Sequence, residues 1–372
     1  MIAMTKAYTP VEIALFNLLR SALGVAENVS VHLSPEEWQK LYALSKQQSV
    51  TGLVCAGVKK LPKDQLPPRA LLLRWATDTE AIRGMNGLIN KEAARLTAIF
   101  DRAGRKTAIL KGPANARLYP DPGCRQCGDI DLWVEGGRKS VGKLLYQLKL
   151  IDSMLEAHVA WHHIHLPRTK DGIVTEVHFK TASAKQFSER ALEKYLTNEI
   201  LKSELVPEGF YAPSIKFALV MQLSHLQQHI FSSGIGLRHY ADYMVLLIHS
   251  TESDRKEAAA VIKSLYMGHT CAAVMWLLGE VFGLSRERML CEPDVIRGKR
   301  IFDLAMQGGN LGKYADKHHN VFVQWLMSRK RKWSWFRFDP LNVICSEFKY
   351  FYTTITLIPV RIKQGRIKAH FE

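Results

Sequence analysis

Over most of the chain, hydrophobic residues recur every three or four positions, which is the spacing of one face of an α-helix. Residues 11–19 show this pattern, and residues 34–37 (Ser-Pro-Glu-Glu) predict a helix start with a serine N-cap and a capping box. Prolines between residues 61 and 68 interrupt the pattern. A long amphipathic helix is then predicted over residues 72–103, ended by Gly104.

Further along, the pattern changes to the two-residue alternation of β-strands. Strands are predicted at residues 107–110, at 128–132, and in a hairpin with a turn at residues 169–172. The hairpin strands are expected at 157–166 and 172–180, with a helix near 139–150 before them. Beyond about residue 182 the pattern predicts helices alone, two of them at 213–231 and 237–249.

These elements predict a mixed α/β (α+β) fold, in which a small mixed sheet lies between an N-terminal helical segment and a mainly helical C-terminal half. The length of 372 residues favours two or three domains. We expect an N-terminal helical segment (1–75), an α/β core (76–182), a C-terminal helical domain (183–327) and a basic aromatic tail (328–372).

The chain is strongly basic, with a net charge of +16. Such a charge favours polyanionic partners, namely nucleoside triphosphates, nucleic acid or an anionic membrane surface, and does not choose among them. Six cysteines in so long a chain make no dense disulfide framework. The N-terminus lacks the order of a signal peptide, and no apolar run reaches the roughly 18 residues of a spanning helix. We therefore expect a soluble cytoplasmic protein without a transmembrane segment.

Acidic side chains with metal-binding character lie on two of the predicted strands. Asp129 and Asp131 share one face of their strand, about 7 Å apart. Glu176 and His178 likewise share a face of a later strand, and Glu176 would complete a triad if the two strands are neighbours. Hard oxygen ligands favour Mg²⁺ or Mn²⁺. The alternative is that these carboxylates merely solvate strand ends.

A set of motifs resembles a known family. Its parts are Leu110-Lys111-Gly112, residues 118–125, Gly128-Asp129-Ile130-Asp131-Leu132 and Glu176-Val177-His178. Together they resemble the uncharacterised nucleotidyltransferase family of the DNA polymerase β-like superfamily, and residues 234–242 are similar to a segment of its helical half. The likeness covers roughly residues 75–245. Lys111-Gly112 replaces the Gly-Ser pair of the wider superfamily, as in the narrower family.

The resemblance implies a metal-dependent reaction. An acceptor hydroxyl would attack the α-phosphate of a nucleoside triphosphate such as ATP, and pyrophosphate would leave. Asp129 and Asp131 would bridge two Mg²⁺ or Mn²⁺ ions, and Glu176 would hold the ion that activates the hydroxyl. The acceptor is unidentified: a sugar, another small molecule, a protein side chain or RNA. The alternative function is a non-catalytic nucleotide- or nucleic-acid-binding protein on a transferase-like scaffold.

Four residues around the aspartates are assigned to nucleotide binding. Gly112 would allow close backbone approach to phosphate, and Lys111 and Arg125 would neutralise charge developing on it. Gly128 is the fourth, directly before Asp129 in the motif. Two other interpretations stay open. Lys111 could be an ordinary surface lysine, and Arg125 could pair with Asp121 in its own loop.

Histidines add further candidates for the site. His178 could orient Glu176, bind metal or contact the nucleotide, or be a half-exposed strand residue. His163 and His165 share one face of the preceding strand, and the hairpin could bring them near His178. A zinc cluster is conceivable there, although no cysteine or compact spacing supports it.

The helical half contributes two more nucleotide-binding candidates, His225 and Arg238. His225 lies in a polar stripe with Gln222 and His229, which would face either the nucleotide or solvent. Arg238 could reach the site, as the resemblance implies, or simply pair with Asp242 on its own helix.

The tail combines cations with aromatic residues from Ser328 to Phe338. This composition suits stacking on nucleic-acid bases, contact of residues 328–372 with an anionic surface, or a plain basic helix that covers the fold.

Overall fold

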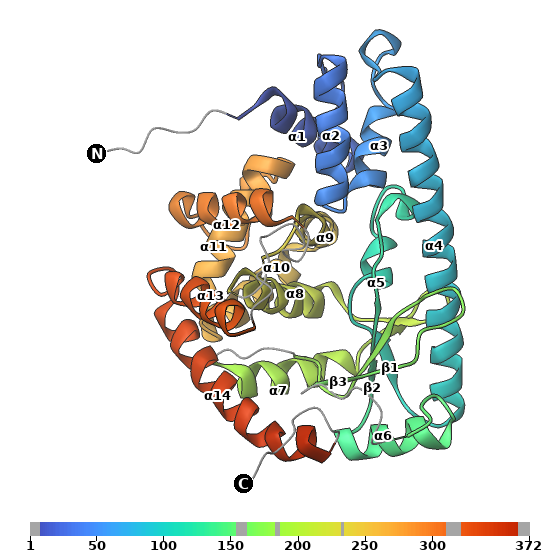
Figure 1. Ribbon diagram of the computed structural model, residues 1–372, viewed down its shortest axis with the longest axis vertical. Coiled ribbons are helices and arrows are strands. Elements are labelled where there is room, and N and C mark those ends of the chain that lie inside the picture. The colour runs from blue at the N-terminus through green and yellow to red at the C-terminus, as the bar shows by residue number, and fades with distance from the viewer. Residues whose placement is uncertain (1–7, 154–161, 183–186, 232–233, 310–320, 364–372) are drawn as a thin grey trace.

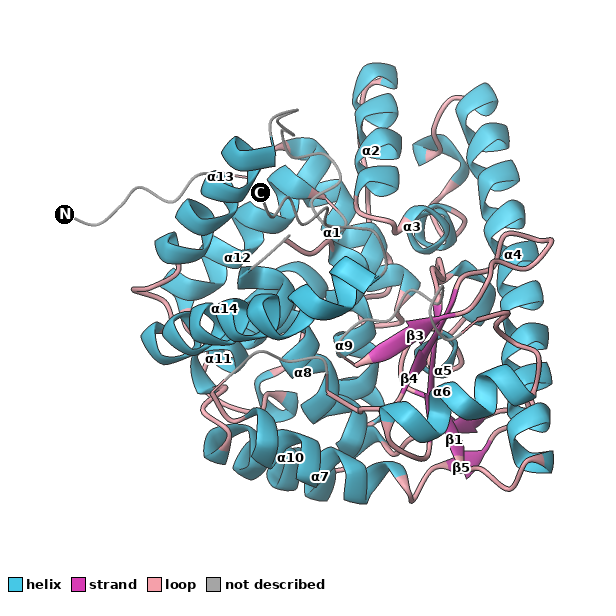
Figure 2. Ribbon diagram, turned by 60° about the horizontal axis from the view of Figure 1, so that its bottom comes forward, coloured by secondary structure: helices cyan, strands magenta, loops and turns pink. Residues whose placement is uncertain are grey.

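The computed structural model describes residues 8–153, 162–182, 187–231, 234–309 and 321–363. Its central feature is a four-stranded sheet in the order β1-β2-β4-β3. The strands are β1 (Thr107–Ile109), β2 (Ile130–Val134), β3 (His163–His165) and β4 (Thr175–His178). β2 runs antiparallel to β1 and parallel to β4, whereas β3 and β4 form an antiparallel hairpin (Figure 2). The predicted mixed α/β class is confirmed. Residues 157–161 of the predicted hairpin lie outside the described residues.

The strand register brings the polar residues of three strands together. Asp131 on β2 lies opposite Glu176 on β4, and Glu176 in turn lies opposite His165 on β3. His163 lies opposite His178 in the same hairpin. Side chains of directly paired residues are near neighbours on one face of a sheet. The polar face of this sheet is therefore built from residues that are up to 47 positions apart in the sequence.

The apolar face of the sheet packs against α4 (Arg69–Arg102) and α6 (Arg138–Gln147). α4 runs along one side of the molecule beside the strands (Figure 1). The buried residues shared by these elements include Ile89, Leu96, Phe100, Ile130, Leu132, Leu145 and Val177. Because side chains alternate across a strand, burial of Ile130 and Leu132 here directs Asp131 to the opposite face.

The N-terminal helices follow their sequence signals closely. They are α1 (Pro10–Ala22), α2 (Pro35–Gln47) and α3 (Thr51–Val58), followed by the short helix η1 (Lys63–Gln65). The predicted serine cap is present, because Ser34 and Glu37 form a complete capping box at the start of α2. After β1 come α5 (Pro113–Ala116) and η2 (Pro122–Cys124), which lead into β2.

The C-terminal half is mainly helical, as predicted. Its helices are α7 (Glu189–Ile200), α8 (Ile215–Phe231), α9 (Leu237–His249), α10 (Glu252–Ser264), α11 (Gly268–Leu277), η3 (Leu278–Phe282), η4 (Arg286–Arg288), α12 (Val295–Gly308), α13 (Val321–Ser334) and α14 (Pro340–Lys363). The expectation of helices alone was wrong at one place, where β5 (Glu204–Leu205) and β6 (Tyr211–Ala212) pair. Gly209, with φ of 87°, allows the tight turn between them.

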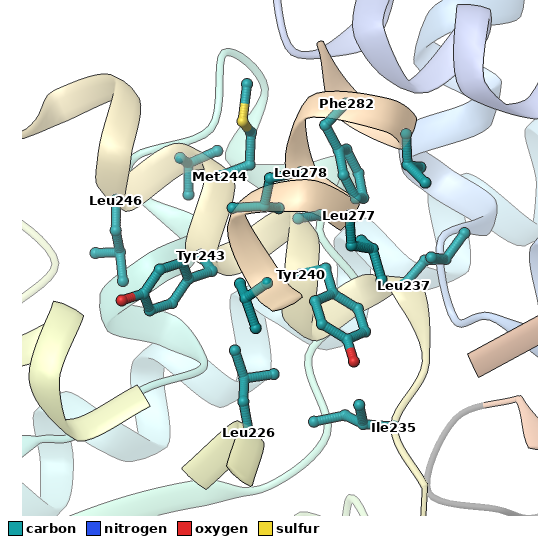
Figure 3. Packing of buried hydrophobic residues seen from close by; sticks show 14 of the residues in the cluster. Leu226, Ile235, Leu237, Tyr240, Tyr243, Met244, Leu246, Leu277, Leu278 and Phe282 are labelled. Atoms are coloured by element: carbon teal, nitrogen blue, oxygen red, sulfur yellow. The ribbon is translucent and has the colours of Figure 1, made fainter. Parts of the chain in front are cut away.

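A single hydrophobic cluster joins the N-terminal helices to the C-terminal half. It combines α1 and α3 with α8, α9, α11 and η3. Figure 3 shows its centre, where Tyr240 and Tyr243 of α9 pack beside Leu277, Leu278 and Phe282. The chain on both sides of the sheet therefore contributes to one core. Among the described residues, no helix combines the length and the apolar character needed to span a membrane.

Candidate active site

A cavity of about 290 Å³ lies between the polar face of the sheet and the helices α8 and α9. Its sheet wall carries Asp129, Asp131, Glu176 and His178, together with Lys111 from the turn after β1. Its helix wall carries His225, His229, Arg238 and His239. The remaining three predicted site residues, Gly112, Arg125 and Gly128, do not line this cavity.

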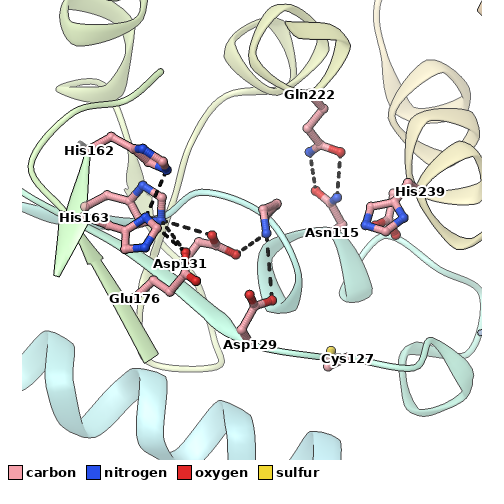
Figure 4. Close-up of polar contacts among 12 residues, drawn as sticks. Asn115, Cys127, Asp129, Asp131, His162, His163, Glu176, Gln222 and His239 are labelled. Carbon is pink, nitrogen blue, oxygen red and sulfur yellow. Dashed lines mark hydrogen bonds and ion pairs between the residues drawn. The ribbon is translucent and has the colours of Figure 1, made fainter. Parts of the chain in front are cut away.

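The carboxylates of Asp131 and Glu176 meet at the imidazole of His178. His178 Nε2 lies 3.1 Å from Asp131 Oδ1 and 3.5 Å from Glu176 Oε2. Asp129 lies just before β2 and is more exposed, with its Oδ1 3.9 Å from Lys111 Nζ. Lys111 also forms an ion pair with Asp131. The three acidic residues predicted from the sequence therefore converge on one wall of the cavity (Figure 4).

Electrostatics favour the ionised forms of Asp131 and Glu176, although burial of these side chains opposes them. Burial would raise the pKa of Asp131, but the charge of Lys111 and the hydrogen bond with His178 hold it well below its usual value. The pKa of Glu176 is also lowered, because its contact with His178 outweighs the effect of burial. Burial would lower the pKa of Lys111, but the nearby charges of Asp129 and Asp131 raise it. The wall thus holds three carboxylates against the ammonium of Lys111 and the imidazole of His178. Burial would lower the pKa of His178, but its hydrogen bonds to Asp131 and Glu176 raise it.

This excess of negative charge fits a divalent cation. The ligand atoms of Asp131, Glu176 and His178 all lie within 4.8 Å of one another. Ionised carboxylates grouped at this distance repel each other unless a cation lies among them. Oxygen ligands of this kind are those that Mg²⁺ and Mn²⁺ prefer.

The helix wall is different in character, because its histidines are uncharged. Burial lowers the pKa of His225 and His239 well below the usual value and that of His229 to about 4. The rings of His225 and His229 lie 4.4 Å apart between centroids. Gln222, predicted to lie in the same stripe, instead exchanges two hydrogen bonds of 2.9 Å with Asn115 (Figure 4). The polar stripe is therefore divided between the cavity, which His225 and His229 line, and the protein interior, where Gln222 lies. It is not a solvent-facing stripe.

Arg238 reaches the cavity from the first turn of α9. Its Nη1 donates to the carbonyl oxygen of Gln126 at 3.1 Å, in the loop before β2. Arg238 Nε and His239 Nδ1 are buried atoms without a hydrogen-bond partner in the part of the chain that the structure describes. Buried polar atoms that lack a partner are costly, so a bound polar ligand is one way to satisfy them.

Two ion pairs suggested by the sequence were wrong. Arg125 does not pair with Asp121, and Arg238 does not pair with Asp242. Instead Arg125 donates to both carboxylate oxygens of Asp242, at 3.0 and 2.6 Å, and both side chains are almost fully buried. The loop turns at η2, so Asp121 faces α4 and pairs with Arg83 at 2.9 Å. Arg125 lies behind the cavity wall rather than in it.

The two predicted glycines lie close to this wall. Gly112 has a φ of 64°, and a Cβ there would lie 3.4 Å from the carbonyl oxygen of Asp129. The positive φ therefore disfavours a side chain at Gly112, whereas the space around it would admit a Cβ. A Cβ at Gly128 would lie 3.5 Å from Arg238 Nη1. The conformation of the backbone thus explains the glycine at position 112, and the space around Gly128 does not require a glycine there.

Sequence reasoning left two cavity histidines unassigned. His162 and His239 both line the cavity. His239 lies within the family-like segment 234–242 but was given no role, and His162 shows neither a motif nor a strand alternation that would indicate its place. His163 and His165, considered for a zinc cluster, do lie near His178, because the hairpin pairs their strands. His162 could have been placed in the cavity only from the pairing register of β3 and β4, which the sequence alone does not reveal.

A cavity with clustered carboxylates beside a glycine turn, in a small mixed sheet with helices around it, is the arrangement of a phosphoryl- or nucleotidyl-transferring protein. The chain belongs to the uncharacterised nucleotidyltransferase family, whose family model matches residues 34–283. The family that the sequence motifs suggested is confirmed, and membership gives the chain a general nucleotidyltransferase role.

A structural comparison gave a more distant likeness. The fold is similar to the crystal structure of an antigenic nucleotidyltransferase-like protein from Paracoccidioides brasiliensis, with 15% sequence identity and a TM-score of 0.33. The likeness covers 56% of this chain and 95% of that chain. A search among curated proteins found no match.

Proposed function

We propose that this protein transfers a nucleoside monophosphate from a nucleoside triphosphate to a hydroxyl acceptor in a reaction that requires Mg²⁺ or Mn²⁺. The observation that carries the proposal is the charge imbalance of the sheet wall. Asp129, Asp131 and Glu176 face one ammonium, that of Lys111, and the single imidazole of His178. A metal ion held by these carboxylates would neutralise phosphate charge and make the acceptor hydroxyl a better nucleophile.

The residues around the carboxylates suit a bound triphosphate. Lys111 lies beside both aspartates and can also meet a phosphate oxygen. The left-handed turn at Gly112 keeps side-chain atoms away from that position. Arg238 extends from the opposite wall and has an unpartnered Nε in the described structure. In the transfer, the acceptor oxygen forms a bond to the α-phosphorus, and the bond from that phosphorus to pyrophosphate breaks.

The helix wall suits the neutral parts of the substrates. His225, His229 and His239 are uncharged, so they can donate or accept hydrogen bonds without adding to the positive charge there. We infer that the α/β core (76–182) supplies the metal and phosphate groups, whereas the helical domain (183–327) contacts the base or the acceptor. Acceptor choice would then depend on the helical half.

Label transfer tests the proposal. The full chain is incubated with α-labelled triphosphates, Mg²⁺ or Mn²⁺, and separate pools of sugars, peptides and RNA. Labelled product and pyrophosphate are expected together, and both should be lost in Asp129→Ala and Asp131→Ala. Asp152→Ala removes an exposed carboxylate outside the cavity and is the matched control.

The same samples address the non-catalytic alternative. A protein that only binds nucleotide would be stabilised against heat by triphosphate and metal, yet would give no labelled product. Equal transfer by wild type and both aspartate variants would overturn the proposed mechanism.

A second proposal concerns the tail, residues 328–372, which we expect to contact an anionic membrane surface. Exposed apolar residues follow one face of α14 at helical spacing, namely Leu341, Ile344, Phe348, Tyr352 and Ile355. α13 adds exposed Trp325 and Trp333, and cations such as Lys330 and Arg337 are exposed nearby. A basic chain with an aromatic helix face suits an anionic interface.

Vesicle flotation tests the tail. The full chain should float with vesicles that contain phosphatidylserine and much less with neutral vesicles, and added salt should weaken binding. Phe348→Ser with Tyr352→Ser should reduce flotation. Equal flotation with neutral vesicles, or none with either, would overturn the proposal.

A further inference from the structure

The cavity contains a second set of possible metal ligands, made of nitrogen rather than oxygen. His162, His163, His165 and His178 lie around Glu176, at the end of the sheet wall away from Asp129. Their rings are close: the centroids of His162 and His163 are 4.4 Å apart, and those of His163 and His178 are 5.1 Å apart. Figure 4 shows His162 and His163 directed towards the carboxylates of Asp131 and Glu176.

We propose that His162, His163, His178 and Glu176 form a binding site for a transition-metal ion such as Zn²⁺ or Co²⁺. Glu176 and His178 also belong, with Asp131, to the group that fits the proposed magnesium ion, so both residues lie between the two sets of ligands. The histidine site stands on geometry alone and does not require that the protein catalyse transfer.

The separations between ligand atoms fit one ion. His163 Nδ1 lies 2.9 Å from His162 Nε2 and 3.3 Å from Glu176 Oε2. His178 Nε2 lies 3.5 Å from the same Glu176 oxygen. Tetrahedral coordination with metal–ligand bonds of about 2.0–2.1 Å places ligand atoms about 3.3–3.4 Å apart. Only small adjustments would be needed.

The backbone holds these ligands in place. His163 and His178 are directly paired across the β3–β4 hairpin. The carbonyl oxygen of His162 accepts a hydrogen bond of 3.0 Å from the amide of Phe179, which continues the ladder by one residue. Ligands that paired strands already hold in place lose little conformational freedom when an ion binds, so ordering them costs little binding free energy.

A supporting contact lies behind the ligands. His163 Nε2, the ring nitrogen that points away from Glu176, lies 3.0 Å from His165 Nε2. Histidines that bind metal commonly donate a hydrogen bond from their second nitrogen, which fixes the tautomer and the ring orientation. His165 would therefore be a positioning residue for His163.

The type of ligand decides the type of ion. Mg²⁺ is bound through oxygen and keeps several waters, whereas imidazole suits Zn²⁺, Co²⁺ and other borderline ions. A site with three imidazoles and one carboxylate should therefore discriminate strongly against Mg²⁺. The alternative to a metal site is a network of hydrogen bonds among the histidines that only orients Glu176.

Cobalt binding to the full chain without nucleotide tests the proposal. Co²⁺ is added to metal-free protein, and its visible absorption reports tetrahedral nitrogen ligation. A single tight equivalent is expected that excess Mg²⁺ does not displace and Zn²⁺ does. His163→Ala should lower Co²⁺ affinity by about 10–100-fold or more, while His269→Ala, an exposed histidine on α11, should leave it unchanged.

A second variant guards against misfolding. His162→Asn changes a residue outside the regular strands and should also weaken Co²⁺ binding, with an unchanged circular dichroism spectrum. Displacement of Co²⁺ by Mg²⁺, or equal affinity in wild type and both histidine variants, would overturn the histidine site. Neither result would affect the proposed transfer, which depends on Asp129 and Asp131 and is measured separately.

Discussion

Two buried ion pairs lie on either side of the loop before β2, and they differ in how their charges are balanced. Lys111 pairs with Asp131 at the cavity, and Arg125 pairs with Asp242 inside the protein. The second pair is one cation with one anion, and the hydroxyl of Tyr119 donates a further hydrogen bond of 2.7 Å to Asp242. All of its strong hydrogen-bonding partners are protein groups.

The cavity pair lacks this balance. Lys111 faces Asp129 and Glu176 as well as Asp131, so its charge is shared among three carboxylates. Burial and ion pairing are common to both sites, so neither property distinguishes a functional site from a structural one. The excess of one sign of charge, open to a cavity, does make that distinction.

The largest expected effect follows from changing the unbalanced site. Asp131→Asn should lower the proposed nucleotidyl transfer by about 10⁴-fold, equivalent to about 5 kcal/mol of transition-state stabilisation, because a proposed metal ligand is lost. Its thermal midpoint should change little in comparison. Initial rates and thermal unfolding of the same preparation measure both, and a large loss of stability with normal specific activity would contradict the comparison.

The opposite result is expected at the balanced pair. Asp242→Ala leaves the buried guanidinium of Arg125 without its carboxylate, so the free energy of unfolding should fall by about 3–5 kcal/mol. Denaturant titration measures this loss. The double variant Arg125→Met with Asp242→Leu should recover much of it, since an apolar pair removes both charges. A loss below about 1 kcal/mol in the single variant would show that water reaches the pair.

Tyr119→Phe tests the same structural site more gently. It removes the donor to Asp242 and keeps the ring in the core, so we expect a loss of about 1–2 kcal/mol in the free energy of unfolding. The proposed transfer activity of the folded protein should stay unchanged, because Tyr119 does not line the cavity. A selective loss of activity without loss of stability would place Tyr119 in the catalytic machinery instead.

The smallest effect concerns a third, more exposed pair, Arg83 with Asp121. The hydrogen bonds from Arg83 lower the pKa of Asp121 from 3.8 to about 2. Because the pKa of Asp121 is lower in the folded protein than in the unfolded chain, ionised Asp121 stabilises the fold at pH values above the unfolded-state pKa. This stabilisation is lost as the pH falls through about 2. Both side chains are more than one-third exposed, so the contribution should stay below about 1 kcal/mol. Asp121→Asn should reduce the slope of stability against pH between about 4 and 2.

Much of the fold could be predicted from local signals. The Ser34 cap, the long helix α4 and the alternation at β2 each depend on a few neighbouring residues. The β5–β6 pair could not be predicted in this way, because strands of two residues are too short to show a period. Its signal is the turn sequence Pro207-Glu208-Gly209 between the two strands.

The site was less accessible to prediction. The motif placed Asp129, Asp131 and Glu176 in one site, and the structure places these side chains on one wall. The partners of Arg125 and Asp121 could not be inferred, because each lies on a helix distant in sequence. Asp242 follows Arg125 by 117 positions, and Arg83 precedes Asp121 by 38. Periodicity within a segment carries no information about such long-range pairs.

The link between Arg125 and Asp242 also limits how this chain can be divided. A shortened protein that ends after the sheet would retain the arginine and lose the aspartate, and with it the α8–α9 surface that covers the cavity. Such a fragment would carry an isolated buried cation beside uncovered carboxylates. We therefore expect that shortened variants and natural gene fusions both need residues 69–249 intact in order to fold.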